Sequence, residues 1–279
     1  MLIRDILLHL EARDSTQPTI EFASSLAVRI GAHLTAAGLA IDYPPPPVGP
    51  TIGGLGFGGA IALEKLKEEN CHALEQAGQK FTSGAPTGLQ TNFTVIQGYR
   101  GEACYAFARL ARYFDLSIVS QAAPNQASID QRVVTETLFG SGRPLFIVPF
   151  IHKGPARLDR AMICWDGGAQ SARAIAAAMP LLALSHHVEI VTIGGDWEIP
   201  PEPDLKIAIH LARHGVKASL TVLPDAREVG EAILSYAADT SADYIVMGGY
   251  GHWRFTELVI GGTTKTILGS MTTPVLMTH

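Results

Sequence analysis

The sequence of 279 residues predicts an α/β fold made of two duplicated, doubly wound domains, each a five-stranded parallel sheet with helices on both faces. Three observations predict this class. The length accommodates about two domains of roughly 150 residues each. Short runs rich in β-branched residues alternate with amphipathic helical stretches, which is typical of parallel strands joined by right-handed crossovers. Short segments recur at a fixed spacing, which indicates an internal duplication.

Each half is expected to contain five strands separated by four helices, because apolar runs that suit strands alternate with stretches whose apolar residues recur every three or four positions. In the first half, the strands are expected at residues 6–10, 33–41, 91–96, 116–120 and 145–148, and the helices at residues 18–30, 60–81, 102–113 and 129–138. In the second half, the strands are expected at residues 160–165, 188–193, 218–222, 244–247 and 274–277, and the helices at residues 169–182, 204–214, 228–238 and 263–270.

The duplication is visible in the residues themselves. The tripeptide Gly-Glu-Ala at 101–103 recurs at 230–232, and Thr-Leu-Phe-Gly-Ser at 137–141 recurs as Thr-Ile-Leu-Gly-Ser at 266–270, both 129 positions later. We therefore expect one domain at residues 1–152 and a second at residues 156–279.

The first copy carries an insertion around residues 42–69. Within it, residues 54–59 match the pattern G-x-G-x-x-G, but they follow a run of four prolines in the second strand-to-helix connection. A dinucleotide fingerprint belongs between the first strand and its helix. We therefore expect residues 42–59 to form a mobile surface loop and not a phosphate site.

Composition excludes several classes of protein. The chain is 47% hydrophobic and 17% charged with a net charge of −5, and neither half has an excess of basic residues, so neither a nucleic-acid partner nor a membrane anchor is expected. The longest apolar run, residues 174–184, is shorter than the roughly 18 residues of a membrane span. Charges near the N-terminus argue against a signal peptide, and the three scattered cysteines indicate no disulfide framework or zinc site, so the cytoplasm is the expected location.

The loop after the fourth strand of the second copy carries the most specific chemical signal. In an open parallel sheet, ligands bind beyond the carboxyl ends of the strands where the winding direction reverses. Gly248 and Gly251 allow the backbone to approach a ligand closely, and Gly261 and Gly262 open the following helix. The free amides at that helix N-terminus, together with the hydroxyls of the adjacent residues Thr263 and Thr264, suit phosphate oxygens.

The spacing Gly248-x2-Gly251-x9-Gly261 resembles the signature of universal stress proteins, and the duplication makes the whole chain similar to a tandem member of that family. The resemblance implies that this loop binds the ribose and phosphates of ATP or ADP, with or without Mg²⁺. It further implies that Asp166 lies near the adenosine, that Thr192 and Ile193 face the adenine, and that Met247 contacts the base.

The residues leave alternatives open at this site. Asp166 could instead cap the helix that begins near Ala169. Gly262 stands where the family commonly has Ser or Thr, and Tyr250 and His252 could stack on a nucleotide or block it. The first copy has Glu11 in place of Asp166 and no glycine between residues 119 and 139, so no ATP is expected to bind there through this loop.

These observations favour a stress-response protein that binds one adenine nucleotide in its C-terminal half as a regulatory, non-catalytic ligand. Two alternatives remain: a scaffold that has lost nucleotide binding, and a slow ATPase. The last strand of each half is expected at a sheet edge, where the two halves would pair as a pseudo-dimer. The resemblance also implies that two chains could dimerise.

Overall fold

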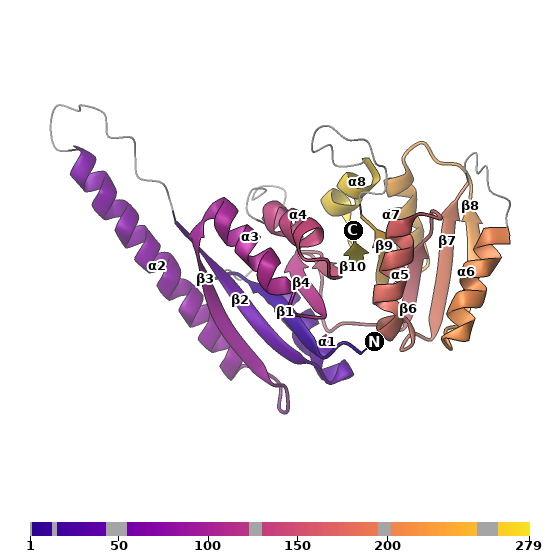
Figure 1. The fold of residues 1–279 in the computed structure, drawn as a ribbon, viewed down its shortest axis with the longest axis horizontal. Helices are drawn as coiled ribbons and strands as arrows, with labels where there is room; N and C mark the ends of the chain where they lie inside the picture. Colours follow the sequence, from indigo (N-terminus) through magenta and orange to yellow (C-terminus); the bar gives the residue numbers. More distant parts are fainter. Residues whose placement is uncertain (1, 13–15, 43–54, 123–129, 195–201, 250–261) are drawn as a thin grey trace.

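The computed structural model describes residues 2–12, 16–42, 55–122, 130–194, 202–249 and 262–279. Within these residues the chain forms one ten-stranded sheet with helices on both faces (Figure 1). The N-terminal half contains β1 (Asp5–Leu10), α1 (Gln17–Ile30), β2 (His33–Asp42), α2 (Leu55–Ser83), β3 (Thr91–Tyr99), α3 (Arg100–Ala111), β4 (Leu116–Ser120), α4 (Asp130–Gly140) and β5 (Leu145–Val148). The C-terminal half contains β6 (Arg160–Cys164), α5 (Ala169–Leu182), β7 (His187–Ile193), α6 (Glu202–Arg213), β8 (Ala218–Leu223), α7 (Val229–Asp239), β9 (Tyr244–Gly248), α8 (Gly262–Ser270) and β10 (Val275–Thr278). The predicted fold class is confirmed.

The sheet is continuous across the two halves. Its strand order is β3-β2-β1-β4-β5-β10-β9-β6-β7-β8, and the strands within each half are parallel. The two strands predicted to pair the halves do so, since β5 and β10 are antiparallel with Phe146 opposite Leu276. Because this pair is antiparallel, the carboxyl ends of the strands in one half point to the opposite edge of the sheet from those in the other half.

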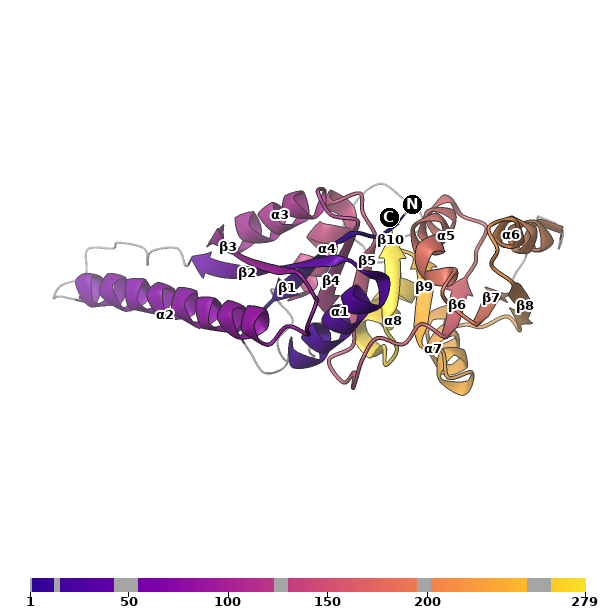
Figure 2. The same cartoon turned by 90° about the horizontal axis from the view of Figure 1, so that it is seen from below.

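Two apolar layers lie on the two faces of the sheet. One layer joins Leu8 of β1 with residues of α1, α2, α5 and α6, and the other joins its neighbour Leu7 with residues of α3, α4, α7 and α8. This division follows from the alternation of side chains along a strand. Both layers contain residues of β5 and β10, so the core runs across the junction between the halves. Figure 2 shows β5 and β10 side by side at this junction.

Helix α2 differs from the expectation. It begins at Leu55 instead of residue 60, so residues 55–59 of the predicted loop are helical, and residues 43–54 lie outside the described residues. Each glycine lowers helix stability by only about 1 kcal/mol, whereas proline stops a helix. The helix therefore extends through the glycine-rich stretch and projects beyond the sheet (Figure 1).

Candidate functional site

The winding direction of the C-terminal half reverses between β6 and β9. These two strands are neighbours, with Ile163 opposite Val246, while β7 and β8 lie on one side of the pair and β10 lies on the other. Asp166 follows β6 and Gly248 ends β9, so both lie at the carboxyl edge of the sheet at this reversal. This is the location where open α/β sheets bind ligands.

Asp166 stabilises the first turn of α5. Its Oδ1 accepts hydrogen bonds from the backbone amide of Gly168 at 2.8 Å and from the hydroxyl of Ser171 at 2.5 Å. Asp166 is not the N-cap of this helix, because Gly168 occupies that position, so Asp166 supports the turn from two residues upstream. The residue is exposed, and none of the described residues donates a hydrogen bond to Oδ2. This arrangement leaves the second carboxylate oxygen available to a ligand.

Cys164 ends β6 two residues before Asp166 and is half-buried. Burial, followed by the nearby Asp166 carboxylate, raises the pKa of the Cys164 thiol to about 12. The side chain therefore stays a neutral thiol at physiological pH and contributes an apolar surface to this end of the strand.

Gly248 brings the end of β9 against the first turn of α5. A Cβ atom at this position would lie 2.6 Å from the backbone nitrogen of Ser171 and 2.7 Å from the carbonyl carbon of Gln170. Because both are backbone atoms, the contact requires a glycine. The close approach places the Asp166–Ser171 pair beside the start of the glycine motif.

The N-terminal half fills the corresponding position with side chains. Strand registers align Ser120 with Gly248, and Thr19 occupies the place of Ser171 in the first turn of the preceding helix. The two hydroxyls form a buried hydrogen bond of 2.8 Å. Glu11, in the position of Asp166, is 11% exposed and lies 3.8 Å from Nδ1 of His9. Equivalent edges of the two halves therefore differ in chemistry.

Three further predicted residues end β7 and β9. Thr192 is 3% exposed, and its hydroxyl has no hydrogen-bond partner among the described residues. Ile193 packs at the border of the core, and Met247 is buried in the core layer that includes α7 and α8. The Met247 side chain is therefore a core residue, so only its backbone can face a ligand.

The first turn of α8 carries the last three described residues of the predicted site. Gly262 is exposed, Thr263 is half-buried and Thr264 is buried. A glycine in α7, Gly230, allows this turn to approach closely, since a Cβ there would lie 2.7 Å from Cβ of Thr266. The predicted site residues Gly251 and Gly261 lie outside the described residues, as do Tyr250 and His252.

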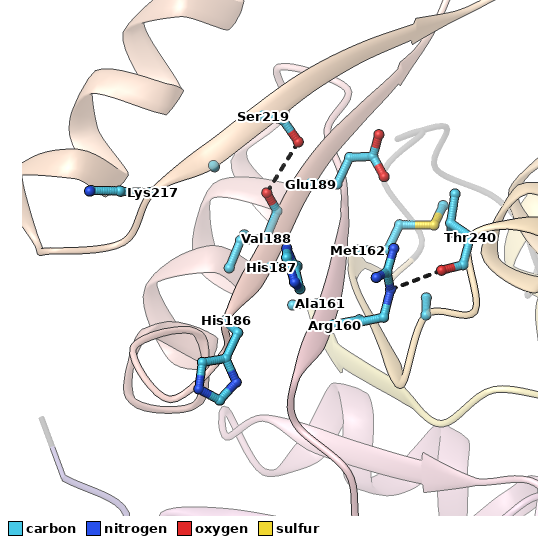
Figure 3. Close-up of a pocket in the computed structure, with 12 residues that line it drawn as sticks. Arg160, Ala161, Met162, His186, His187, Val188, Glu189, Lys217, Ser219 and Thr240 are labelled. Carbon is cyan, nitrogen blue, oxygen red and sulfur yellow. Dashed lines mark hydrogen bonds between the residues drawn. The ribbon is translucent and has the colours of Figure 1, made fainter.

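A hollow that sequence reasoning did not anticipate lies at the opposite, amino edge of β6, β7 and β8 (Figure 3). Its volume is about 420 Å³, and Figure 3 labels among its lining residues Arg160, Met162, His187, Glu189, Ser219 and Thr240. Nε of Arg160 donates to the carbonyl of Thr240 at 3.0 Å, and the Glu189 carboxylate accepts a bond of 2.7 Å from the hydroxyl of Tyr236. Its lining residues come from separate strands and carry no sequence motif, so no linear signal could have identified it.

No helix in the described ranges is long and apolar enough to cross a membrane. No group of three or more His, Cys, Asp or Glu side chains in those ranges could hold a metal ion.

Residues 158–279 match the model of the Universal stress protein family. Over 138 residues the chain is 31% identical to the universal stress protein Slr1230 of Synechocystis, and this alignment covers 48% of this chain and 46% of that protein. The chain thus spans about half the length of this relative.

Solved structures resemble the chain over almost its whole length. A universal stress protein from Archaeoglobus fulgidus has a TM-score of 0.71 at 14% identity, covering 98% of this chain and 95% of that one. A functionally unknown protein from Pseudomonas aeruginosa has a TM-score of 0.61 at 14% identity, covering 99% and 92%. A universal stress protein in complex with cAMP aligns with 54% of this chain and 99% of that one at 18% identity and a TM-score of 0.33, so its ligand is a property of that protein. At these identities the structural comparisons support the fold alone.

Proposed function

We propose that this chain is a tandem universal stress protein that binds one molecule of ATP or ADP at the strand reversal of its C-terminal half. One observation carries the proposal: Asp166, with one free carboxylate oxygen, and Gly248, at the start of the glycine motif, are held side by side at the reversal in the half that matches the family. The first half, residues 1–152, would be a second, degenerate copy of the same domain.

The described residues at this edge fit an adenine nucleotide. Oδ2 of Asp166 would accept a hydrogen bond from a ribose hydroxyl. The free amides of the first turn of α8, which begins at Gly262, would bind phosphate oxygens, helped by the helix dipole. The motif glycines Gly251 and Gly261 would allow the backbone to approach the phosphates.

We propose a regulatory ligand and not a substrate. Among the described residues at the reversal, the carboxylate of Asp166 is already engaged by the α5 turn through Oδ1. The other polar groups of these residues are hydroxyls and backbone amides, which bind charge without moving protons at neutral pH. Any Mg²⁺ would arrive with the nucleotide phosphates. Occupancy of the site would then change the conformation or the partners of the protein.

Calorimetric titration of the purified full chain with ATP and ADP, with and without Mg²⁺, tests the proposal. We expect one site per chain. The matched variants Asp166→Asn and Glu11→Gln remove equivalent carboxylates, and only Asp166→Asn should weaken binding. No binding at millimolar nucleotide, together with an unchanged melting temperature, would favour the scaffold alternative. Release of phosphate that Asp166→Asn abolishes would favour the ATPase alternative, and two sites per chain would contradict the degeneracy of the first copy.

A further inference from the structure

A partly buried hydrogen bond crosses from the N-terminal half to the last turn of α8. Nε2 of Gln121, which directly follows β4, donates to the carbonyl oxygen of Leu268 at 2.9 Å. Gln121 is 3% exposed. The last four carbonyls of a helix have no partner within the helix, so Gln121 satisfies one of them and caps α8 from the other half.

A second contact from the N-terminal half reaches the end of β9, where the glycine motif begins. Gly249, directly after β9, faces Leu138 of α4 so closely that a Cβ on Gly249 would lie 2.9 Å from Cδ2 of Leu138. The neighbouring residue Phe139 also contacts the C-terminal half, since its ring lies 4.5 Å from the ring of His279. The end of α4 therefore packs against the carboxyl edge of β9 and β10.

These two contacts are equivalent under the pseudo-symmetry of the halves. Gln121 and Gly249 each follow the fourth strand of their half, and their amides donate to the last strand at 2.7 Å and 2.8 Å, respectively. Each residue meets the last turn of the final helix of the other half. The same junction is thus built twice, once with a polar side chain and once with a glycine.

The two contacts are made to the elements that border the glycine motif. In the C-terminal half, this motif begins at the end of β9 and finishes at the start of α8. The N-terminal half contacts Gly249 directly after β9 and Leu268 in α8. Both contacts come from buried residues, Leu138 in α4 and Gln121 directly after β4. A small displacement of α8 would break the Gln121–Leu268 hydrogen bond.

We propose that the N-terminal half, which lacks the motif, positions the end of β9 and helix α8 through Leu138 and Gln121 and thereby sets the nucleotide affinity. This inference rests on the proposed function. Gln121 is a positioning residue, because it acts through α8 and not on the ligand. The degenerate copy then serves as a permanent partner for the binding copy.

The substitution Gln121→Met tests the inference, because methionine has nearly the length of glutamine but no donor. Gln97→Met is the matched control, since Gln97 donates only within its own half, to Asp42. ATP affinity is measured calorimetrically far below the melting temperature, and amide hydrogen exchange of α8 is measured without nucleotide. We expect Gln121→Met to weaken ATP binding about two- to tenfold and to accelerate α8 exchange, while Gln97→Met stays within twofold of the wild type.

The outcomes separate the inference from the function on which it rests. Wild-type binding with equal affinity in Gln121→Met would overturn the inference and leave the proposed function standing. Absence of binding in the wild type would overturn the proposed function, and unchanged α8 exchange would overturn the positioning role independently of any ligand. If Gln121→Met does not fold, Gln121→Asn keeps a buried amide but withdraws it by one methylene, and the same expectations apply.

Discussion

The substitution Gly248→Ala adds a single methyl group, but it should destabilise the protein more than the small volume of that group suggests. In Gly248→Ala, the new Cβ would lie 2.6 Å from the Ser171 nitrogen and 2.7 Å from the Gln170 carbonyl carbon. Ordinary contacts of a Cβ begin at 3.4 Å, so the end of β9 and the first turn of α5 must separate by about 0.8 Å. Backbone atoms on both sides cannot rotate away as a flexible side chain would.

The structure indicates the size of the effect. Introducing a carbon atom into a well-packed interior costs about 1–3 kcal/mol of the free energy of unfolding. For chains of roughly this size, each 1 kcal/mol lowers the melting temperature by about 2–4 °C, so we expect a decrease of about 2–12 °C. The displacement also moves Ser171, which donates to Asp166, so ATP binding should weaken in parallel.

Differential scanning calorimetry of Gly248→Ala and Gly269→Ala measures this difference. Gly269 lies in α8, where a Cβ would meet nothing within 4 Å, so alanine there should be neutral or stabilising by up to about 1 kcal/mol. If both variants melt at the wild-type temperature, the close approach of β9 to α5 is wrong. If both are destabilised equally, the effect does not arise from the contact with Ser171.

Three other perturbations separate structure from binding. Asp166→Asn keeps an oxygen for the α5 turn, so it should retain the melting temperature while weakening ATP binding about tenfold or more. Asp166→Ala removes this oxygen and should also lower the free energy of unfolding by about 0.5–2 kcal/mol. If calorimetry shows equal ATP affinity for Asp166→Asn and the wild type, Asp166 acts only on the α5 turn. Gly262→Ser adds a hydroxyl where a Cβ meets nothing within 4 Å, so ATP titration should show affinity equal to the wild type or up to about tenfold tighter, and weaker binding would contradict a phosphate site at this turn. Burial lowers the pKa of His152 below 6.5, so its contribution to stability is complete above pH 6.5 and declines as the pH falls toward the folded-state value. In urea unfolding experiments, the free energy of unfolding should therefore decrease less between pH 7 and pH 5 for His152→Gln than for the wild type. An equal decrease in the two proteins would refute this prediction.

Much of the fold was predictable from the sequence because it depends on local periodicity. Alternating strand and helix patterns predicted the ten strands. The expected position of each last strand at a sheet edge predicted that the halves would pair there, as β5 and β10 do. The start of α2 was wrong by five residues, because a glycine-rich stretch only weakens a helix that its downstream residues already stabilise.

The sequence predicted the residues of the candidate site but not their contacts. The spacing of Gly248, Gly251 and Gly261 predicted a nucleotide loop, and Asp166 was expected at the end of β6. The sequence could not decide between an N-cap role and ligand binding for Asp166. In the structure Gly168 is the N-cap, and Asp166 binds the α5 turn through Oδ1 alone, because both donors reach the same oxygen.

Periodicity and spacing along the chain predicted two copies, the order of their elements and the location of the glycine motif, because these properties can be followed residue by residue. The residues that meet across the halves follow from the three-dimensional arrangement of the strands. Gln121 and Leu268 are separated by 147 positions, and no pattern along the chain connects them. They meet because the antiparallel pairing of β5 with β10 places the start of each connecting loop beside the end of the other half's last helix.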